Sequence, residues 1–226
     1  MAYSAMDEAF TRRHILLGIP LVLAGCGTAI DIASRNLDSR YSSLYGAIDD
    51  PPFTIPALDL AEIDPSVLRQ EVAYRGPYRP GTVVVKLSER RLYLVENGGR
   101  ALRYGVGVGR EEALNFQGSA KIGQKAKWPR WTPTASMIAR IPKYAAYAGG
   151  MPGGPGNPLG ARALYLYQDG HDTSFRLHGT NEPESIGQAI SSGCIRLFNH
   201  DIIHIYSRLA IGTPVVVEPE SGPETS

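Results

Sequence analysis

Short β-rich segments separated by turn residues dominate the chain from Thr82 onwards, and they limit the possible folds more than any other feature. The chain holds runs rich in β-branched, aromatic and aliphatic residues at 82–87, 92–95, 101–108, 163–167, 175–178 and 215–217. Polar and glycine-rich turns lie between the first three, at 88–91 and at Asn97-Gly98-Gly99. The pattern therefore predicts a mainly antiparallel β-sandwich or barrel.

Helical signals are few and short. The sequence predicts helices at 65–74, 134–140 and 184–189, and one beginning near Asn199. Asn199 is a suitable N-cap, and an apolar stripe of Ile202, Ile205, Tyr206 and Leu209 would face the core. His200 and His204 would then lie beside Arg208 on a solvated face, so we expect no metal site there.

A Gly- and Pro-rich segment at 149–160 fits neither a helix nor a strand. Long irregular loops in compact domains are often binding loops or lids, and we expect one here. Trp128 and Trp131, on either side of Pro129-Arg130, either line a substrate groove or pack within the domain.

The N-terminus is typical of an export signal. Arg12 and Arg13 precede the apolar run 15–25, which is too short to span a bilayer, and the run ends in a lipobox-like Leu-Ala-Gly before Cys26. The paired arginines also resemble a twin-arginine signal, and a buried N-terminal helix is the alternative. We predict a signal peptide at 1–25, lipidation of Cys26, a tether at 26–80, a catalytic domain at 81–219 and a disordered tail at 220–226.

Charge and cysteine content narrow the function. The net charge of +1 argues against nucleic-acid binding. The chain has two cysteines, so lipidation of Cys26 would leave Cys194 without a partner in an exported protein. A lone thiol in that setting indicates a reactive residue, although a buried structural thiol is the alternative.

A base for this thiol lies close in sequence. His178 ends a predicted strand, and Cys194 follows a Ser-Ser-Gly turn, so the chain can fold back and bring imidazole beside thiol. The N–H groups of Gly193 and Cys194 could stabilise an oxyanion. Arg196 either binds a substrate carboxylate or forms a structural ion pair.

These residues belong to a longer motif. His178-Gly-Thr-Asn, then Ser185-Ile-Gly187, then Ser191-Ser-Gly-Cys-Ile-Arg196 with Asn199 soon after resembles the signature of the L,D-transpeptidase (YkuD-type) catalytic domain. The resemblance implies a mainly β fold of mixed sheets with a few short helices, Cys194 as nucleophile, His178 as base and the Gly179 carbonyl as its orienting group. It also implies substrate contacts at Thr180, Asn181, Ser191, Ser192 and Arg196, although many members have His where this chain has Ser192.

The resemblance implies a reaction on peptidoglycan stem peptides. Cys194 would displace the terminal D-Ala of a tetrapeptide stem and form a thioester without a metal or organic cofactor. The acceptor would be an amine, from a second stem or from a lysine of an envelope lipoprotein. Water as acceptor, giving a carboxypeptidase or amidase, and an inactive peptidoglycan-binding module are the alternatives. We expect a lipid-anchored protein of the periplasm or cell envelope.

Overall fold

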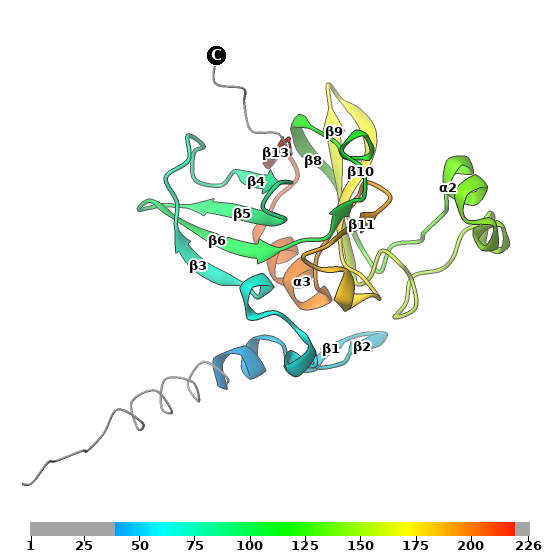
Figure 1. The fold of residues 1–226 in the computed structure, drawn as a ribbon, viewed down its shortest axis with the longest axis horizontal. Helices are drawn as coiled ribbons and strands as arrows, with labels where there is room; N and C mark the ends of the chain where they lie inside the picture. Colours follow the sequence, from blue (N-terminus) through cyan, green and yellow to red (C-terminus); the bar gives the residue numbers. More distant parts are fainter. Residues whose placement is uncertain (1–38, 220–226) are drawn as a thin grey trace, which may run out of the picture. The chain divides into compact units, whose positions relative to one another are not determined.

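A computed structural model describes residues 39–219 of the chain, and a nine-stranded mixed sheet dominates that part (Figure 1). Its strand order is β12-β10-β9-β8-β13-β4-β5-β6-β3. One half is an antiparallel meander of β4 (Val83–Lys86), β5 (Arg91–Glu96) and β6 (Arg100–Gly105), with β3 (Gln70–Ala73) at its edge.

The other half carries the longest strands. β8 (Gly118–Lys127), β9 (Arg162–Gln168) and β10 (His171–His178) are antiparallel neighbours, and the short β12 (Ile195–Arg196) runs parallel to β10. β13 (Pro214–Glu218) joins the halves, parallel to β4 and antiparallel to β8. The mainly β fold with mixed sheets is thereby confirmed.

The remaining elements are short. Two further sheets pair β1 (Ile48–Asp50) with β2 (Phe53–Ile55), and β7 (Val108–Gly109) with β11 (Ala189–Ser191). The α-helices are α2 (Ala135–Arg140) and α3 (Asn199–Arg208), and residues 39–44 are also helical. The 3-10 turns are η1 (Leu60–Glu62), η2 (Pro65–Val67), η3 (Glu112–Leu114), η4 (Pro142–Tyr147) and η5 (Pro183–Ser185). No helix within residues 39–219 is long and apolar enough to cross a membrane.

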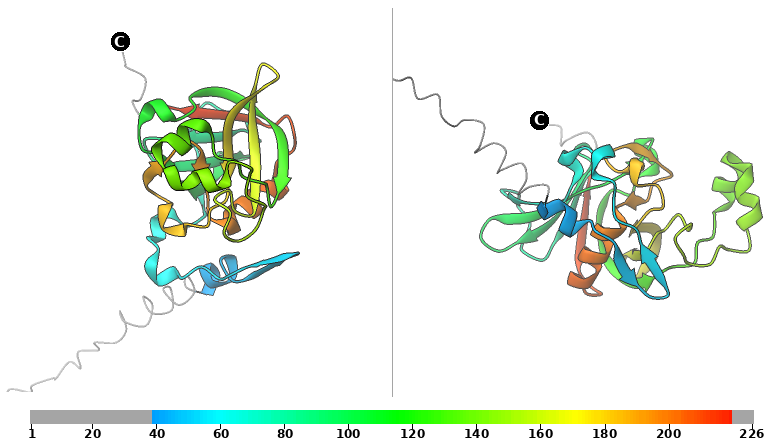
Figure 2. Two further views of the ribbon diagram at one scale, coloured as in Figure 1. Left: turned by 90° about the vertical axis from the view of Figure 1, so that its right-hand side faces the viewer. Right: turned by 90° about the horizontal axis from the view of Figure 1, so that it is seen from below.

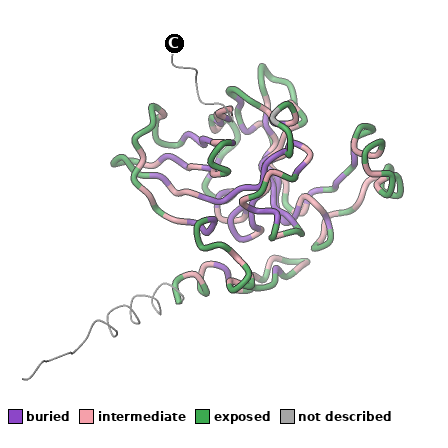
Figure 3. Tube along the Cα trace, viewed as in Figure 1, coloured by how far each residue is buried: buried purple, intermediate pink, exposed green. Residues whose placement is uncertain are grey.

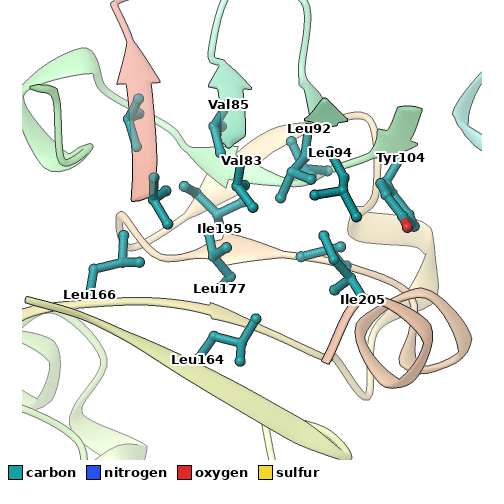
Figure 4. Close-up of a cluster of buried hydrophobic side chains, with 14 of the residues drawn as sticks. Val83, Val85, Leu92, Leu94, Tyr104, Leu164, Leu166, Leu177, Ile195 and Ile205 are labelled. Atoms are coloured by element: carbon teal, nitrogen blue, oxygen red, sulfur yellow. The ribbon is translucent and has the colours of Figure 1, made fainter. Parts of the chain in front are cut away.

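A single apolar cluster fixes the strands that carry the motif. Leu177 of β10 and Ile195 of β12 are almost fully buried among side chains from both halves of the sheet and from α3 (Figure 4). Burying such a side chain contributes about 1.5–3 kcal/mol. The residues flanking these two anchors, His178 and Cys194, are therefore held on a rigid base. Figure 3 shows the same contrast along the chain, with buried strands in the centre and an exposed arm that contains α2.

Part of the segment predicted as a tether packs on the domain. Tyr45, Val67 and Leu68 are buried in a second cluster with Ile186 and Phe198. Residues 40–68 run along one side of the sheet domain (Figure 2), and residues 70–73 form its edge strand β3. The predicted signal peptide, Cys26 and the tail 220–226 lie outside the described residues.

Each of the six predicted strand regions contains a strand, whereas two of the predicted helices are wrong. Residues 65–74 form η2 and then β3, because the chain extends to pair with β6. Residues 184–189 contain only the end of η5 before β11 pairs with β7. β8 was not predicted because Gly118–Lys127 holds only Ile122 as a β-branched residue and no aromatic one.

Candidate active site

Parallel pairing of β10 and β12 brings the two motif halves together. Leu177 lies beside Ile195 and His178 beside Arg196, which sets Cys194 at the entrance to β12. His178 and Cys194 both line one groove with a volume of about 550 Å³. The 15 residues between His178 and Cys194 therefore fold back and bring the two side chains to one groove, as predicted from the sequence.

His178 is held as a neutral imidazole. The residue is 4% exposed, and its Nδ1 lies 2.6 Å from the carbonyl oxygen of Gly179. A carbonyl only accepts, so Nδ1 carries the proton and Nε2 keeps its lone pair. Burial, with the charge of Arg196 as a lesser cause, lowers the pKa of His178 to about 3. The ring is therefore unprotonated at neutral pH and can accept a proton through Nε2.

The backbone around His178 requires glycine. A Cβ on Gly179 would lie 2.2 Å from Oδ1 of Asn199, which is too close for any side chain. That Asn199 oxygen accepts from the Ala161 N–H at 2.9 Å, and its Nδ2 donates to the Thr180 carbonyl at 2.9 Å. Asn199 is the first residue of α3 and Phe198 is the N-cap, so the predicted capping role of Asn199 is wrong. Its amide ties the loop after His178 to the start of β9.

Cys194 is half-buried, and two opposing effects act on its thiol. Burial raises the pKa of Cys194, while the backbone N–H and the charge of Arg176 counteract this. Sequence reasoning missed Arg176, although the alternation of side chains along β10 places it on the same face as His178. Its guanidinium pairs with Asp172 at 2.8 and 2.9 Å and lies over the Tyr165 ring, 4.4 Å from the centroid.

Gly193 shapes the turn before the thiol. Its φ is +121°, and a Cβ there would lie 2.0 Å from the Leu114 carbonyl oxygen. Its N–H donates to Ser191 Oγ at 3.1 Å, and that hydroxyl donates to the Cys194 carbonyl at 2.8 Å. The Gly193 N–H is thus engaged, which argues against its predicted role as an oxyanion donor. Within residues 39–219 the Cys194 N–H has no such acceptor.

The other predicted substrate contacts divide between two places. Ser191, Ser192 and Arg196 line the groove, and Arg196 also forms an ion pair with Glu182 at 2.7 Å. Thr180 and Asn181 instead line a separate cavity of about 220 Å³. Trp131 lines the groove, whereas Trp128 lines the second cavity and packs against Phe53.

The prediction that His200 and His204 lie on a solvated face is wrong for His200, whereas His204 is half-buried and accepts from Arg208 Nε at 3.2 Å, beside Arg208 as predicted. His200 is 5% exposed and its Nε2 donates to the Gly46 carbonyl at 2.8 Å, because the N-terminal segment covers this part of α3. Nδ1 of His204 bonds the Tyr104 hydroxyl at 2.9 Å. No group of three His, Cys, Asp or Glu within residues 39–219 is arranged to hold a metal ion.

A thiol and a neutral imidazole in one groove, with a carbonyl fixing the imidazole tautomer, are typical of cysteine-based acyl transfer. The family model of the L,D-transpeptidase catalytic domain (YkuD) matches residues 80–217. The chain belongs to this family.

Curated relatives carry the same family name. The chain is 35% identical to "Probable L,D-transpeptidase YbiS" of Escherichia coli K12 over 141 residues, covering 59% of this chain and 43% of that protein. It is 33% identical over 156 residues to "Probable L,D-transpeptidase ErfK/SrfK" of Salmonella typhimurium, covering 67% and 48%. The match therefore spans less than half of these relatives.

Solved structures give partial overlays. A structure described as a probable carnitine operon oxidoreductase caia from Brucella melitensis is 48% identical, covering 69% of this chain and 96% of that chain with a TM-score of 0.47. An L,D-transpeptidase from Mycobacterium tuberculosis H37Rv is 16% identical, covering 61% and 57% with a TM-score of 0.45. Both TM-scores lie below 0.5, so these overlays add nothing to the family assignment.

Proposed function

We propose that the protein is a cysteine-dependent L,D-transpeptidase that takes its acyl group from a peptidoglycan tetrapeptide stem. One observation carries this proposal: His178 donates Nδ1–H to Gly179, which leaves Nε2 as the proton acceptor in the groove that Cys194 also lines. Membership of the family supports an enzyme that acts on peptidoglycan.

In the first half-reaction, Cys194 Sγ attacks the carbonyl carbon of the L-centre that precedes the terminal D-Ala. Its proton passes to Nε2 of His178, and the Cys194 N–H stabilises the developing oxyanion. The C–N bond to D-Ala then breaks, the leaving amine takes the proton from His178, and a thioester remains on Cys194.

In the second half-reaction, an acceptor amine attacks the thioester carbonyl and gives its proton to His178. The new amide forms, the C–S bond breaks, and Sγ regains the proton. The acceptor is an amine of a second stem or of an envelope lipoprotein. No part of this sequence needs an oxidant, a reductant or a metal, because the thiol and the imidazole supply the nucleophile and the proton transfer.

A soluble variant lacking residues 1–26, incubated with a purified tetrapeptide muropeptide and followed by mass spectrometry, tests the proposal. Cross-linked dimer with loss of D-Ala is the expected product, and Cys194→Ala should abolish it. Tripeptide without dimer would show that water is the acceptor and that the enzyme hydrolyses the stem instead of transferring it. Absence of both products, together with no carbapenem adduct on Cys194, would leave only a peptidoglycan-binding module.

We further propose that Cys26 carries a lipid anchor that holds the domain at the cell envelope. The apolar run before Cys26 and the small residues next to it support this. Cys26→Ser in the full chain should move the protein from the membrane fraction to the soluble fraction. Retention in the membrane fraction would contradict the anchor and would leave the enzymatic proposal intact.

A further inference from the structure

The far side of the groove is formed by an arm whose two arginines have no carboxylate partner within residues 39–219. The arm comprises residues 128–160, contains α2 and η4, and projects from the sheet (Figure 1). Reciprocal backbone hydrogen bonds between Trp131 and Met151, at 2.9 and 2.7 Å, close its base. The Trp131 ring packs against Tyr144 with centroids 5.1 Å apart.

The sequence of this region is unusually one-sided in charge. Between Ala113 and Gln168 there is no Asp or Glu, whereas the same stretch contains Lys121, Lys125, Lys127, Arg130, Arg140, Lys143 and Arg162. Two of these are already used in the structure. Arg162 pairs with Asp50 at 2.6 Å, and Lys125 donates to the Tyr206 and Leu209 carbonyls.

The four arginines that line the groove fall into two kinds. Arg176 and Arg196, on the strands that carry the motif, are paired with Asp172 and Glu182. Arg130 and Arg140, on the arm, are exposed and contact backbone carbonyls of Gly149 and Ser136. Within residues 39–219 neither arm arginine has a carboxylate partner.

Among the residues whose side chains the structure describes, no carboxylate lines the groove to balance these charges. The rest of its lining is apolar, aromatic or hydroxylic apart from the reactive pair, with Trp131, Met137 and Tyr165 among the larger side chains. A guanidinium offers paired N–H donors that match a carboxylate, and a partly enclosed groove screens the pair less than open solvent does. An acyl donor with carboxylates along its length would therefore gain affinity at this wall.

We propose that Arg140 and Arg130 form a carboxylate-binding wall that selects an acyl donor bearing free carboxylates next to the reacting residue. This assignment rests on the proposed function, since it concerns the donor of that reaction. Arg140 and Arg130 act on donor binding, while Cys194 and His178 act on the bond being broken. The wall thus sets KM and leaves kcat nearly unchanged.

Two donor peptides and three matched variants test the wall. The donors are a tetrapeptide stem with free side-chain carboxylates and the same peptide with those carboxylates converted to amides. The variants are Arg140→Gln, Arg130→Gln and Lys143→Gln. The last removes one positive charge from the same arm at an exposed residue that does not line the groove.

For the free-carboxylate donor, Arg140→Gln and Arg130→Gln should each raise KM roughly five- to tenfold with kcat within about twofold, as expected for loss of a charge-assisted hydrogen bond. For the amidated donor neither variant should change KM, and Lys143→Gln should change nothing with either donor. A fourth variant, Arg140→Lys, should recover part of the loss, because the charge returns without the paired donors.

If Lys143→Gln raised KM as much as Arg140→Gln, the effect would come from the overall charge of the arm and not from contacts in the groove, and the assignment would be wrong. Equal losses on both donors would also overturn it, because they would mean that the arm had simply been disturbed. Calorimetric binding of both donors to Cys194→Ala separates the two proposals. If that protein binds neither donor and the wild type converts neither, the proposed function itself is wrong.

Discussion

Two buried histidines of this protein share almost the same local chemistry and have different surroundings. His178 and His200 are both nearly inaccessible, and each donates one ring N–H to a backbone carbonyl, of Gly179 at 2.6 Å and of Gly46 at 2.8 Å. Burial lowers the pKa of both. The ring of His178 faces a groove with a thiol, whereas that of His200 packs on Tyr45 with centroids 5.6 Å apart. A fixed tautomer therefore makes a base only where a nucleophile shares the cavity.

Exchanging each histidine for glutamine is the strongest test of this comparison. His178→Gln should lower kcat about a thousandfold, because no group remains to take the thiol proton. His200→Gln should leave kcat within about threefold, since its amide can still donate to Gly46. Initial rates of D-Ala release from the tetrapeptide give both numbers.

Unfolding midpoints should accompany those rates, to show that each variant is folded. A comparable loss of kcat in folded His200→Gln would mean that the two histidines do not differ in role. Full activity in His178→Gln would remove the base from the proposed mechanism.

Substitution of Gly193, the residue before the thiol, should give the second largest effect on kcat. Gly193 and Gly170 both have positive φ, +121° and +81°, but only at Gly193 would a Cβ meet another atom, the Leu114 carbonyl oxygen. Gly193→Ala should therefore displace the turn and lower kcat about a hundredfold, the scale expected for a shift of about 1 Å in a reacting group.

Gly170→Ala is the matched control, because it imposes the same kind of backbone strain in a hairpin with open space around it. It should cost about 1 kcal/mol of stability and leave kcat unchanged. Similar kinetics for the two alanine variants would show that strain, and not the position of Cys194, governs the effect.

The catalytic motif could be predicted because its residues occur in short runs in a fixed order along the sequence. The tertiary contacts of those residues could not be predicted. The return of the chain from His178 to Cys194 follows from a strand end, a turn and a glycine. The Asn199 side chain accepts from the Ala161 N–H and donates to the Thr180 carbonyl, 38 and 19 residues away, and no local pattern indicates either partner. Its amide therefore looked like an N-cap from sequence alone.

The same limit applies to α3. Its apolar stripe predicted one buried face, but Tyr45, from the described segment before the sheet, covers a second face of the helix by packing on His200. That segment holds several prolines and polar residues, which are typical of a tether. The tertiary structure shows that Tyr45, Val67 and Leu68 pack into a small apolar cluster. This packing buries His200, which the sequence pattern alone does not indicate.

Removing the Tyr45 hydroxyl should affect stability on the His200 side without affecting catalysis. That hydroxyl donates to the Asp201 carboxylate at 3.1 and 3.2 Å and accepts from the Arg69 N–H at 2.6 Å. Burial raises the pKa of Asp201 to about 7, so each donor to this carboxyl matters. Tyr45→Phe should lower the free energy of unfolding by about 1–3 kcal/mol.

Tyr41→Phe is the matched control. The Tyr41 ring lies near Tyr45, with centroids 6.4 Å apart, and this substitution also removes a hydroxyl but leaves the hydrogen bonds to Asp201 in place. Denaturant unfolding gives the free energies, and kcat should stay within about twofold for both variants. A drop in kcat without loss of stability in Tyr45→Phe would connect this cluster to the groove.

The smallest expected effect is the response of thioester formation to pH. A histidine with the ordinary pKa of 6.5 would be mostly protonated at pH 5, and its rate would fall about 30-fold from the neutral plateau. The pKa of His178 is lowered to about 3, so its ring stays neutral at pH 5. The pKa of Cys194 is raised, so the thiol keeps its proton up to pH 8. One protonation state of the pair therefore prevails between pH 5 and pH 8.

Acylation of Cys194 by a carbapenem measures this step without an acceptor amine that would titrate as well. Its second-order rate should vary by no more than about threefold between pH 5 and pH 8 and should fall only below about pH 4. A tenfold rise per pH unit would show that free thiolate is the nucleophile, and His178 would then lose its role as base. A fall in this rate centred near pH 6.5 would show that His178 titrates like a solvent-exposed histidine, and burial would then not control its protonation.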